Sequence, residues 1–275
     1  MQIFVVDAFS DRPFAGNPAG VVLLDTGSFP DDGWLQDVAA EVGLAETAFA
    51  HPLQDRSGAD WALRWFTPTT EVNLCGHATL ATVQVLQSTR VLDQPIRFDT
   101  RSGVLRATAG VEIALDLPTS PVRDITPPPE VADAIGAELL SAFETGPTIG
   151  SMVVEVADEA TVRGITPDLE KVAALPPRGG VIVTARAEDR AAGYDFVSRC
   201  FFPGIGIDED PVTGAAHTAL APLWSARYAL DELTGLQASA RGGLVRTKVC
   251  GDRTFLRGSA VTVIEGRLRA LPAPG

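Results

Sequence analysis

The distribution of apolar and polar residues in the first half of the chain predicts short strands around two helices. Residues 3–9 are mostly β-branched or aromatic, which favours a strand. Residues 31–42 open with acidic side chains and carry apolar residues at helical spacing before Gly43, which predicts a capped helix. Residues 76–87 are mostly apolar without interior Pro or Gly, so we expect a helix that is buried on most sides. Further strands are expected at residues 46–50, 62–66, 98–100, 104–109 and 111–117, whereas residues 19–24 fit either a strand or a helix start.

The second half repeats this plan after a proline-rich segment. Prolines cluster at residues 118–129, so we place the boundary between an N-terminal half, 1–118, and a C-terminal half, 119–275, at this segment. A return of the last strand to the first half stays open. Helices are expected at residues 131–142, 168–174 and 214–226, and strands at residues 151–156, 181–185, 194–202, 245–250, 255–256 and 260–264.

A repeat is also visible in the residues themselves. The first half contains RWFTPTTEVNLCGHATLA at residues 64–81, and the second contains RCFFPGIGIDEDPVTGAAHTALA at residues 199–221. Both run from Arg through an aromatic strand end, a Pro and an acidic loop to a helix that begins with Gly. The pattern predicts an α+β fold of two similar halves, each a sheet around a central helix, with chance similarity as the alternative. Paired units of this kind place ligands where the halves meet.

Composition and charge narrow the classes of partner. The formal net charge is −13, which disfavours nucleic acid and anionic membrane surfaces as partners. Three widely spaced cysteines fit neither a disulfide framework nor a metal knuckle. The N-terminus lacks a basic segment and a long apolar run, and no window is long enough to span a membrane. We therefore expect a cytoplasmic protein with a small anionic metabolite as its ligand.

The two predicted helix starts are the first candidate binding elements. Cys75-Gly76 and Thr213-Gly214 precede the two buried helices. Glycine allows a ligand close to the backbone, and the free N–H groups of a first turn favour an anion such as a carboxylate. The alternative is that both glycines only permit tight packing.

Two of the three histidines lie near these helix starts. His77 follows Gly76 directly, and a helix N-terminus is expected to lower its pKa and favour a neutral imidazole. His217 lies one turn deeper, where a structural hydrogen bond is the expected role. His51 precedes a proline and is interpreted as a surface residue.

Carboxylates supply the candidate acid–base groups. Glu46 opens a strand among small and apolar residues, where partial desolvation would raise its pKa and suit proton transfer; an ordinary strand-edge glutamate is the alternative. Asp208, Glu209 and Asp210 precede the second helix and could cap it. Glu71 is interpreted as a solvated loop residue.

The sequence lacks the motifs of several other classes of enzyme. The sequence contains no GxSxG, HExxH, Walker or complete GxGxxG motif, and no Cys/His cluster has metal-ligand spacing. We therefore expect chemistry that needs side chains alone, with no cofactor and no metal.

These motifs together resemble the phenazine-biosynthesis PhzF-like proteins, which are relatives of diaminopimelate epimerase. The matching stretches are DAFSDRPFAGNPAGVVL (7–23), LAETAF (44–49), FTPTTEVNLCGHATLA (66–81), DEDPVTGAAH (208–217) and ARGG (240–243). The resemblance implies two pseudo-symmetric domains, each a mixed sheet wrapped around a central helix, with the active site between them. It also implies a homodimer.

The resemblance assigns roles residue by residue. The family's catalytic glutamate falls on Glu46, its GHAT histidine on His77 and its DPxTG aspartate on Asp210. The substrate-binding positions fall on Asn17, Cys75, Gly76, Thr213, Gly214 and Ala215. The phenazine enzyme has serine at the last of these, so the alanine removes a hydroxyl donor and argues against that particular substrate.

The related epimerases use two cysteines as opposed acid and base, which this chain does not match. The first position holds Cys75, but the second holds Thr213, whose hydroxyl is too weakly acidic to replace a thiol. A one-base isomerase, in which Glu46 relocates a proton on a small carboxylate-bearing metabolite, is the leading hypothesis. The alternative is a non-catalytic metabolite-binding or regulatory protein that retains the same site.

Overall fold

The computed structural model describes residues 1–272 apart from 57, 91, 93–94, 147–148 and 177–179. Contacts divide the chain into two compact units, of which the first contains residues 1–116 and 257–275 and the second contains residues 117–256. The C-terminal segment therefore returns to the first unit.

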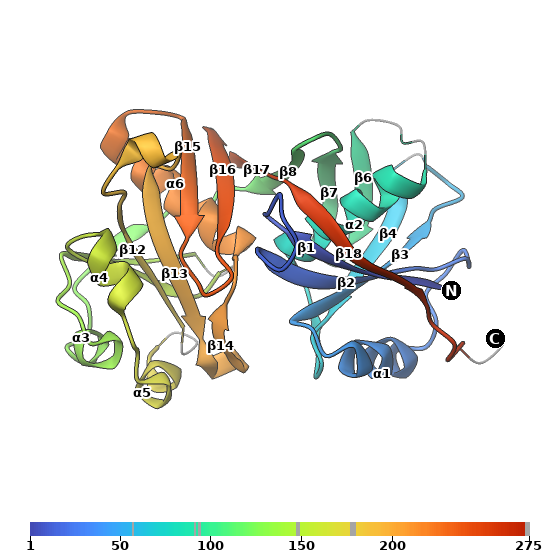
Figure 1. Cartoon of the computed structure of the whole chain (residues 1–275), viewed down its shortest axis with the longest axis horizontal. Coiled ribbons are helices and arrows are strands. Elements are labelled where there is room, and N and C mark those ends of the chain that lie inside the picture. The colour runs from blue at the N-terminus through green and yellow to red at the C-terminus, as the bar shows by residue number, and fades with distance from the viewer. Residues whose placement is uncertain (57, 91, 93–94, 147–148, 177–179, 273–275) are drawn as a thin grey trace. The chain divides into compact units, whose positions relative to one another are not determined.

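The first unit is built on a mixed sheet. Its strands pair in the order β18–β1–β2–β3–β4–β6–β7–β8, and β5 pairs with β4. The β2–β3 and β4–β6 pairs are parallel and the others are antiparallel. Figure 1 shows the C-terminal β18 beside the N-terminal β1. The bounds are β1 Gln2–Ala8, β2 Asn17–Leu23, β3 Glu46–Pro52, β4 Trp61–Phe66, β5 Glu71–Val72, β6 Ile96–Thr100, β7 Gly103–Thr108, β8 Ile113–Pro118 and β18 Ala260–Arg267.

The described residues of this unit include the helices α1 (Asp32–Val42) and α2 (Gly76–Thr89). The side chain of Asp31 caps α1, and Gly43 ends it in the left-handed conformation, as the sequence predicts. The apolar face of α1 packs on one face of the sheet, against Phe49 and its neighbours. Helix α2 contacts β1, β2 and β3 and is buried along most of its length, as predicted (Figure 1).

Strand alternation decides which face of β3 carries Glu46. Successive side chains of a strand point to opposite faces. Phe49 packs in the cluster with α1, and Thr47 is on the same face, because a Cβ on Gly20 would meet both Thr47 and Val42 of α1. Glu46 therefore lies on the opposite face, with α2.

The second unit contains a mixed sheet of its own. Its strands pair in the order β9–β10–β11–β12–β13–β15–β16, and β14 pairs with β13. The β11–β12 and β13–β15 pairs are parallel. The bounds are β9 Arg123–Ile125, β10 Ser141–Glu144, β11 Met152–Glu155, β12 Val181–Arg186, β13 Phe196–Phe202, β14 Ile207–Asp210, β15 Glu232–Gln237, β16 Gly243–Cys250 and β17 Arg253–Gly258.

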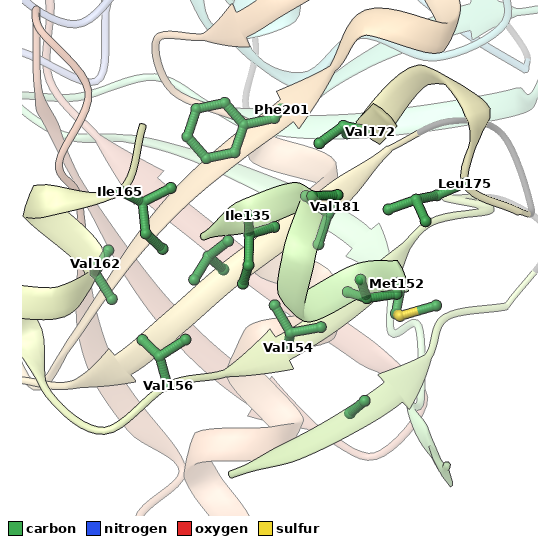
Figure 2. Close-up of a cluster of buried hydrophobic side chains, with 14 of the residues drawn as sticks. Ile135, Met152, Val154, Val156, Val162, Ile165, Val172, Leu175, Val181 and Phe201 are labelled. Atoms are coloured by element: carbon green, nitrogen blue, oxygen red, sulfur yellow. The ribbon is translucent and has the colours of Figure 1, made fainter. Parts of the chain in front are cut away.

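Helices lie on both faces of this second sheet. Helices α3 (Glu130–Ile135), α4 (Glu159–Gly164) and α5 (Leu169–Ala174) supply apolar side chains to one core, which Figure 2 shows with the strand residues Val154, Val181 and Phe201. The alternate strand residues Val153, Ile182 and Cys200 pack with α6 (Gly214–Tyr228) in a separate core. The 3₁₀ turns η1 (Arg190–Ala192) and η2 (Pro203–Ile205) also lie in this unit.

The two sheets share one order of pairing. From β18 to β7 in the first unit, six successive strand pairs are formed, of which the third and the fifth are parallel and the others antiparallel. The six successive pairs from β9 to β16 in the second unit have the same order. In the first unit α2 follows the short strand β5, which pairs with β4. In the second unit α6 follows the short strand β14, which pairs with the equivalent strand β13. The internal repeat predicted from the sequence is thus a repeat of topology, and the α+β fold of two pseudo-symmetric units is confirmed.

Two local predictions were wrong. Residues 131–142 were expected to form one helix, but α3 ends at Ile135, Gly136 takes the left-handed conformation, and β10 begins at Ser141. His51 was expected at the surface, but it is 4% exposed and its ring packs edge-on against Phe29. Its position on the α1 face of β3 explains this burial, since the loop before α1 covers that face. Among the described residues, no helix is long and apolar enough to cross a membrane.

Candidate active site

Three side chains that the sequence analysis singled out meet in the first unit. Glu46 begins β3, and Cys75 and His77 lie at the start of α2. His77 Nε2 lies 3.2 Å from Glu46 Oε2, and the Cys75 sulfur lies 3.5 Å from His77 Nδ1 and 4.0 Å from Nε2. The Glu46 side chain is 12% exposed, so the carboxylate is largely removed from water. We call these residues the Glu46–Cys75–His77 cluster.

Asn17 supports this cluster from a third element. It begins β2, is fully buried, and its side-chain amide lies 3.2 Å from His77 Nδ1. An amide can present either its oxygen or its nitrogen, so Asn17 accepts from a protonated Nδ1 or donates to an unprotonated one. The imidazole at the start of α2 is thus held between the Glu46 carboxylate of β3 and the Asn17 amide of β2.

The protonation of His77 differs from the expectation. A lowered pKa was predicted from the helix N-terminus. Burial does lower the pKa of His77, but attraction to the Cys75 sulfur in its thiolate form and to the Glu46 carboxylate, with hydrogen bonds to both, outweighs it and raises that pKa well above the ordinary value. The two neighbouring acidic groups therefore favour the protonated imidazole near neutral pH.

The surroundings of the Cys75 thiol favour its uncharged form, whereas those of His77 favour the charged form. Burial raises its pKa, and the nearby Glu46 carboxylate adds to that increase. His77 and the backbone N–H of Ala78 lower it, without reversing the direction. Cys75 is therefore a neutral thiol at neutral pH, which makes it a poor base in the protein alone.

Both long central helices begin without a side-chain cap. Asp31, Asp158 and Asp168 cap α1, α4 and α5 through hydrogen bonds to first-turn N–H groups. By contrast, the N-cap residues of α2 and α6, Cys75 and Thr213, make no such bond. The peripheral helices α1, α4 and α5 are closed by carboxylates of the chain itself, whereas the first turns of α2 and α6, like that of the short helix α3, have no side-chain cap.

The equivalent turn of the second unit is held by a residue that the sequence analysis missed. Gln237, at the end of β15, is fully buried. Its Oε1 accepts from the Thr213 backbone N–H at 2.8 Å, and its Nε2 donates to the Asp210 carbonyl oxygen at 2.7 Å and to Thr213 Oγ1 at 3.1 Å. The Thr213 hydroxyl in turn donates to Asp210 Oδ2 at 2.5 Å. No sequence signal distinguished Gln237, because its partners lie on another strand and a turn.

His217 has the structural role that the sequence predicted. Its Nδ1 lies 2.9 Å from the Thr213 carbonyl oxygen, and the ring is fully buried. Burial lowers the pKa of His217 to about 4, so the ring is neutral and Nδ1 donates to the carbonyl. A Cβ on Gly235 would lie 2.9 Å from Nε2 and 2.5 Å from the Phe196 ring, so only glycine leaves room for this histidine.

Two interpretations of acidic residues differ from the structure. Capping of α6 was the alternative role considered for Asp208, Glu209 and Asp210, but these residues form part of β14, and Arg199 binds Glu209. Glu71 was expected in solvent, but its side chain is 11% exposed and pairs with Arg64 and Arg101. Strand pairing with β4 brings Glu71 beside Arg64 and so removes it from water.

Comparison with known proteins defines the family. Residues 6–266 match the family described as phenazine biosynthesis-like protein. The chain belongs to this family. Uncharacterized isomerases of Halalkalibacterium halodurans and Pseudomonas aeruginosa are each 43% identical over 270 residues, covering 97% and 98% of this chain and the same shares of their own. The crystal structure of a PhzF-family phenazine biosynthesis protein of Enterococcus faecalis is 38% identical, with a TM-score of 0.87 over 96% of this chain and 97% of that one.

Membership of the family confirms the resemblance drawn from the motifs. The relatives also place the chain in the isomerase class of enzymes. Nearly the whole length of each relative is covered, so the match includes both units. The names of these relatives specify no substrate.

Proposed function

We propose that this isomerase relocates a proton on a small carboxylate-bearing metabolite, with Glu46 as the general acid–base. Glu46 takes a proton from a carbon next to a carbonyl or a conjugated double bond, which breaks the C–H bond and moves its electron pair into the conjugated system. The same carboxyl group then returns the proton to another carbon on the same face. The substrate is isomerised and Glu46 is regenerated without a second reactant.

The observation that carries this proposal is the pairing of a largely buried carboxylate with an adjacent imidazolium. Glu46 and His77 are 3.2 Å apart in a site with little exposure to water. A carboxylate in such surroundings can accept a proton directly from a substrate carbon that displaces the remaining water. A protonated His77 supplies positive charge beside the negative charge that develops on the substrate. Asn17 orients the ring.

The first turns of α2 and α6 are assigned to substrate binding in this proposal. Gly76 and Gly214 begin the two helices, and neither helix has a side-chain cap. Asp210 is assigned to orienting the substrate, and Ala215 to a pocket surface without a hydroxyl donor. Asp210→Asn is expected to lower turnover, while Asp208→Asn, at an exposed position of β14, is expected to leave it unchanged.

The test is exchange of hydrogen with solvent. The protein is incubated in deuterated water with a panel of small carboxylates that carry an activated C–H bond, and deuterium incorporation is measured by mass spectrometry. At least one compound is expected to exchange, and Glu46→Gln is expected to slow that exchange by about 10²- to 10⁴-fold. Glu41→Gln, at an exposed position of α1, is the matched control and should exchange at the wild-type rate.

The alternative function predicts a different result. A metabolite-binding or regulatory protein would bind a carboxylate, shown by a thermal shift, yet would incorporate no deuterium. Binding without exchange across the panel would therefore contradict the proposed isomerase mechanism and favour that alternative.

A further inference from the structure

The Glu46–Cys75–His77 cluster offers three side chains of the kinds that bind zinc. Among the residues that the structure describes, it is the one group in which a carboxylate oxygen, a thiol sulfur and an imidazole nitrogen all lie within 4.8 Å of one another. The sequence spacing did not indicate a metal site, because Glu46 comes from β3 and the other two from the start of α2. Thiolate, imidazole and carboxylate are the three protein ligands that Zn²⁺ prefers.

The separations within the cluster fit a tetrahedral ion. Zinc bonds of about 2.3 Å to sulfur and about 2.0 Å to nitrogen and oxygen imply ligand separations of about 3.6 Å for sulfur–nitrogen and about 3.3 Å for nitrogen–oxygen. The structure has 4.0 Å between the Cys75 sulfur and His77 Nε2, and 3.2 Å between Nε2 and Glu46 Oε2. The third pair, the Cys75 sulfur and a Glu46 carboxylate oxygen, lies within 4.8 Å, so side-chain rotations must draw the three atoms together onto one ion.

The surroundings of these atoms also suit a metal. A histidine that binds zinc through Nε2 usually has a polar partner at Nδ1, and Asn17 lies 3.2 Å from that atom. A bound divalent cation stabilises the thiolate form of Cys75. A thiolate, a carboxylate and a neutral imidazole together cancel the charge of a divalent cation.

We propose that Zn²⁺ binds Glu46, Cys75 and His77 with a fourth position left to water, and that this binding inhibits the isomerase. Inhibition rests on the proposed function, because the metal occupies the carboxylate assigned to proton transfer. Metal binding itself does not rest on it. Binding converts the Cys75 thiol into a thiolate and the His77 imidazolium into a neutral imidazole that binds through Nε2, and it releases both protons to solvent.

Cobalt is the probe that tests the site directly. Untagged full-length protein, freed of metal with a chelator, is titrated with Co²⁺ alone. We expect one equivalent to give the near-ultraviolet thiolate-to-cobalt charge-transfer band, and one equivalent of Zn²⁺ to remove it. Cys75→Ser should abolish the band, and Asn17→Leu should weaken Co²⁺ binding by about 10- to 100-fold.

Cys250→Ser is the matched control, because Cys250 is exposed and outside the cluster. It should keep the band at full strength. Loss of the band in Cys250→Ser but not in Cys75→Ser, or no band in the wild type, would overturn the proposal. Circular dichroism of each variant separates loss of metal binding from loss of folding, and Glu46→Gln gives a second folded variant, which should keep the band but bind Co²⁺ at least about tenfold more weakly.

The two proposals fail in different ways. If the cobalt band forms but no carboxylate exchanges hydrogen with solvent, the metal site stands and the proposed isomerase mechanism fails. If exchange occurs and no cobalt band forms, the proposed isomerase mechanism stands and the metal site fails. With both present, one equivalent of Zn²⁺ should slow exchange at least about tenfold, and an increase in exchange would contradict inhibition.

Discussion

Glu46 Oε2 and His77 Nε2 lie 3.2 Å apart, at the first residue of β3 and in the first turn of α2. Strand alternation directs Glu46 to the face that α2 covers, and His77, in the first turn of α2, has a side chain that tilts toward the N-terminal end of the helix. A carboxylate and an imidazolium are thereby held together in a site with little water. The proposed proton transfer and the proposed metal site both follow from this one contact.

The relative importance of Glu46 and Cys75 distinguishes one-base from thiol chemistry. Without bound metal, Cys75→Ser should retain hydrogen exchange within about tenfold of wild type, because a thiol with a raised pKa is a poor base. Glu46→Gln should lose most of the exchange. Rates are measured for both variants in the presence of chelator. A thiol epimerase would show the opposite order, with Cys75→Ser inactive.

The raised pKa of His77 predicts how stability depends on pH. A histidine whose folded pKa exceeds its unfolded value contributes stability that is complete below about pH 6.5 and declines as pH rises toward the folded pKa. The stability of wild type relative to His77→Gln should therefore be greatest below about pH 6.5 and fall as the pH rises above that value. Urea unfolding of both proteins at several pH values measures this difference. A difference that grows with pH would show that His77 is neutral in the folded protein.

Acid should destabilise the protein through His217, whose folded pKa is lowered whereas that of His77 is raised. Its folded pKa of about 4 lies below the unfolded value of 6.5, so its contribution is complete above about pH 6.5 and is lost as pH falls toward 4. The size of that loss is about 3 kcal/mol. His217→Gln, which cannot titrate, should lose about that much less stability than wild type between about pH 7 and pH 4. Parallel unfolding curves for the two proteins over this range would contradict the prediction.

Gln237 is predicted to hold the turn at the start of α6. Gln237→Met keeps a similar volume but leaves the Thr213 N–H and the Asp210 carbonyl oxygen without their partner, which should cost about 2–4 kcal/mol in the free energy of unfolding. Hydrogen exchange into substrate should also slow, because Thr213 and Asp210 lose their fixed positions. Gln2→Met, at an exposed position of β1, is the control and should change stability by less than about 0.5 kcal/mol. Equal stability of the two variants would contradict a positioning role.

Local patterns were sufficient for many of the elements. The Asp31 cap and the Gly43 stop of α1, the buried character of α2 and α6, and the strand that begins at Glu46 could all be read from neighbouring residues. The helix expected at residues 131–142 was wrong in its second half, because β10 gains its stability by pairing with β9 and β11. Pairing partners far along the chain leave no mark in a local pattern.

The sequence by itself determined the family, the repeated strand–turn–helix unit and the residue types of the candidate site, because these depend on short motifs and on local periodicity. Only the tertiary structure decided that Cys75 and His77 meet Glu46, that the pKa of His77 is raised, that Gln237 holds Asp210 and Thr213, and that β18 pairs with β1. Each of these depends on distances of a few ångströms between atoms of separate elements. Such distances are set by strand register and packing, which the order of residues encodes only through the whole fold.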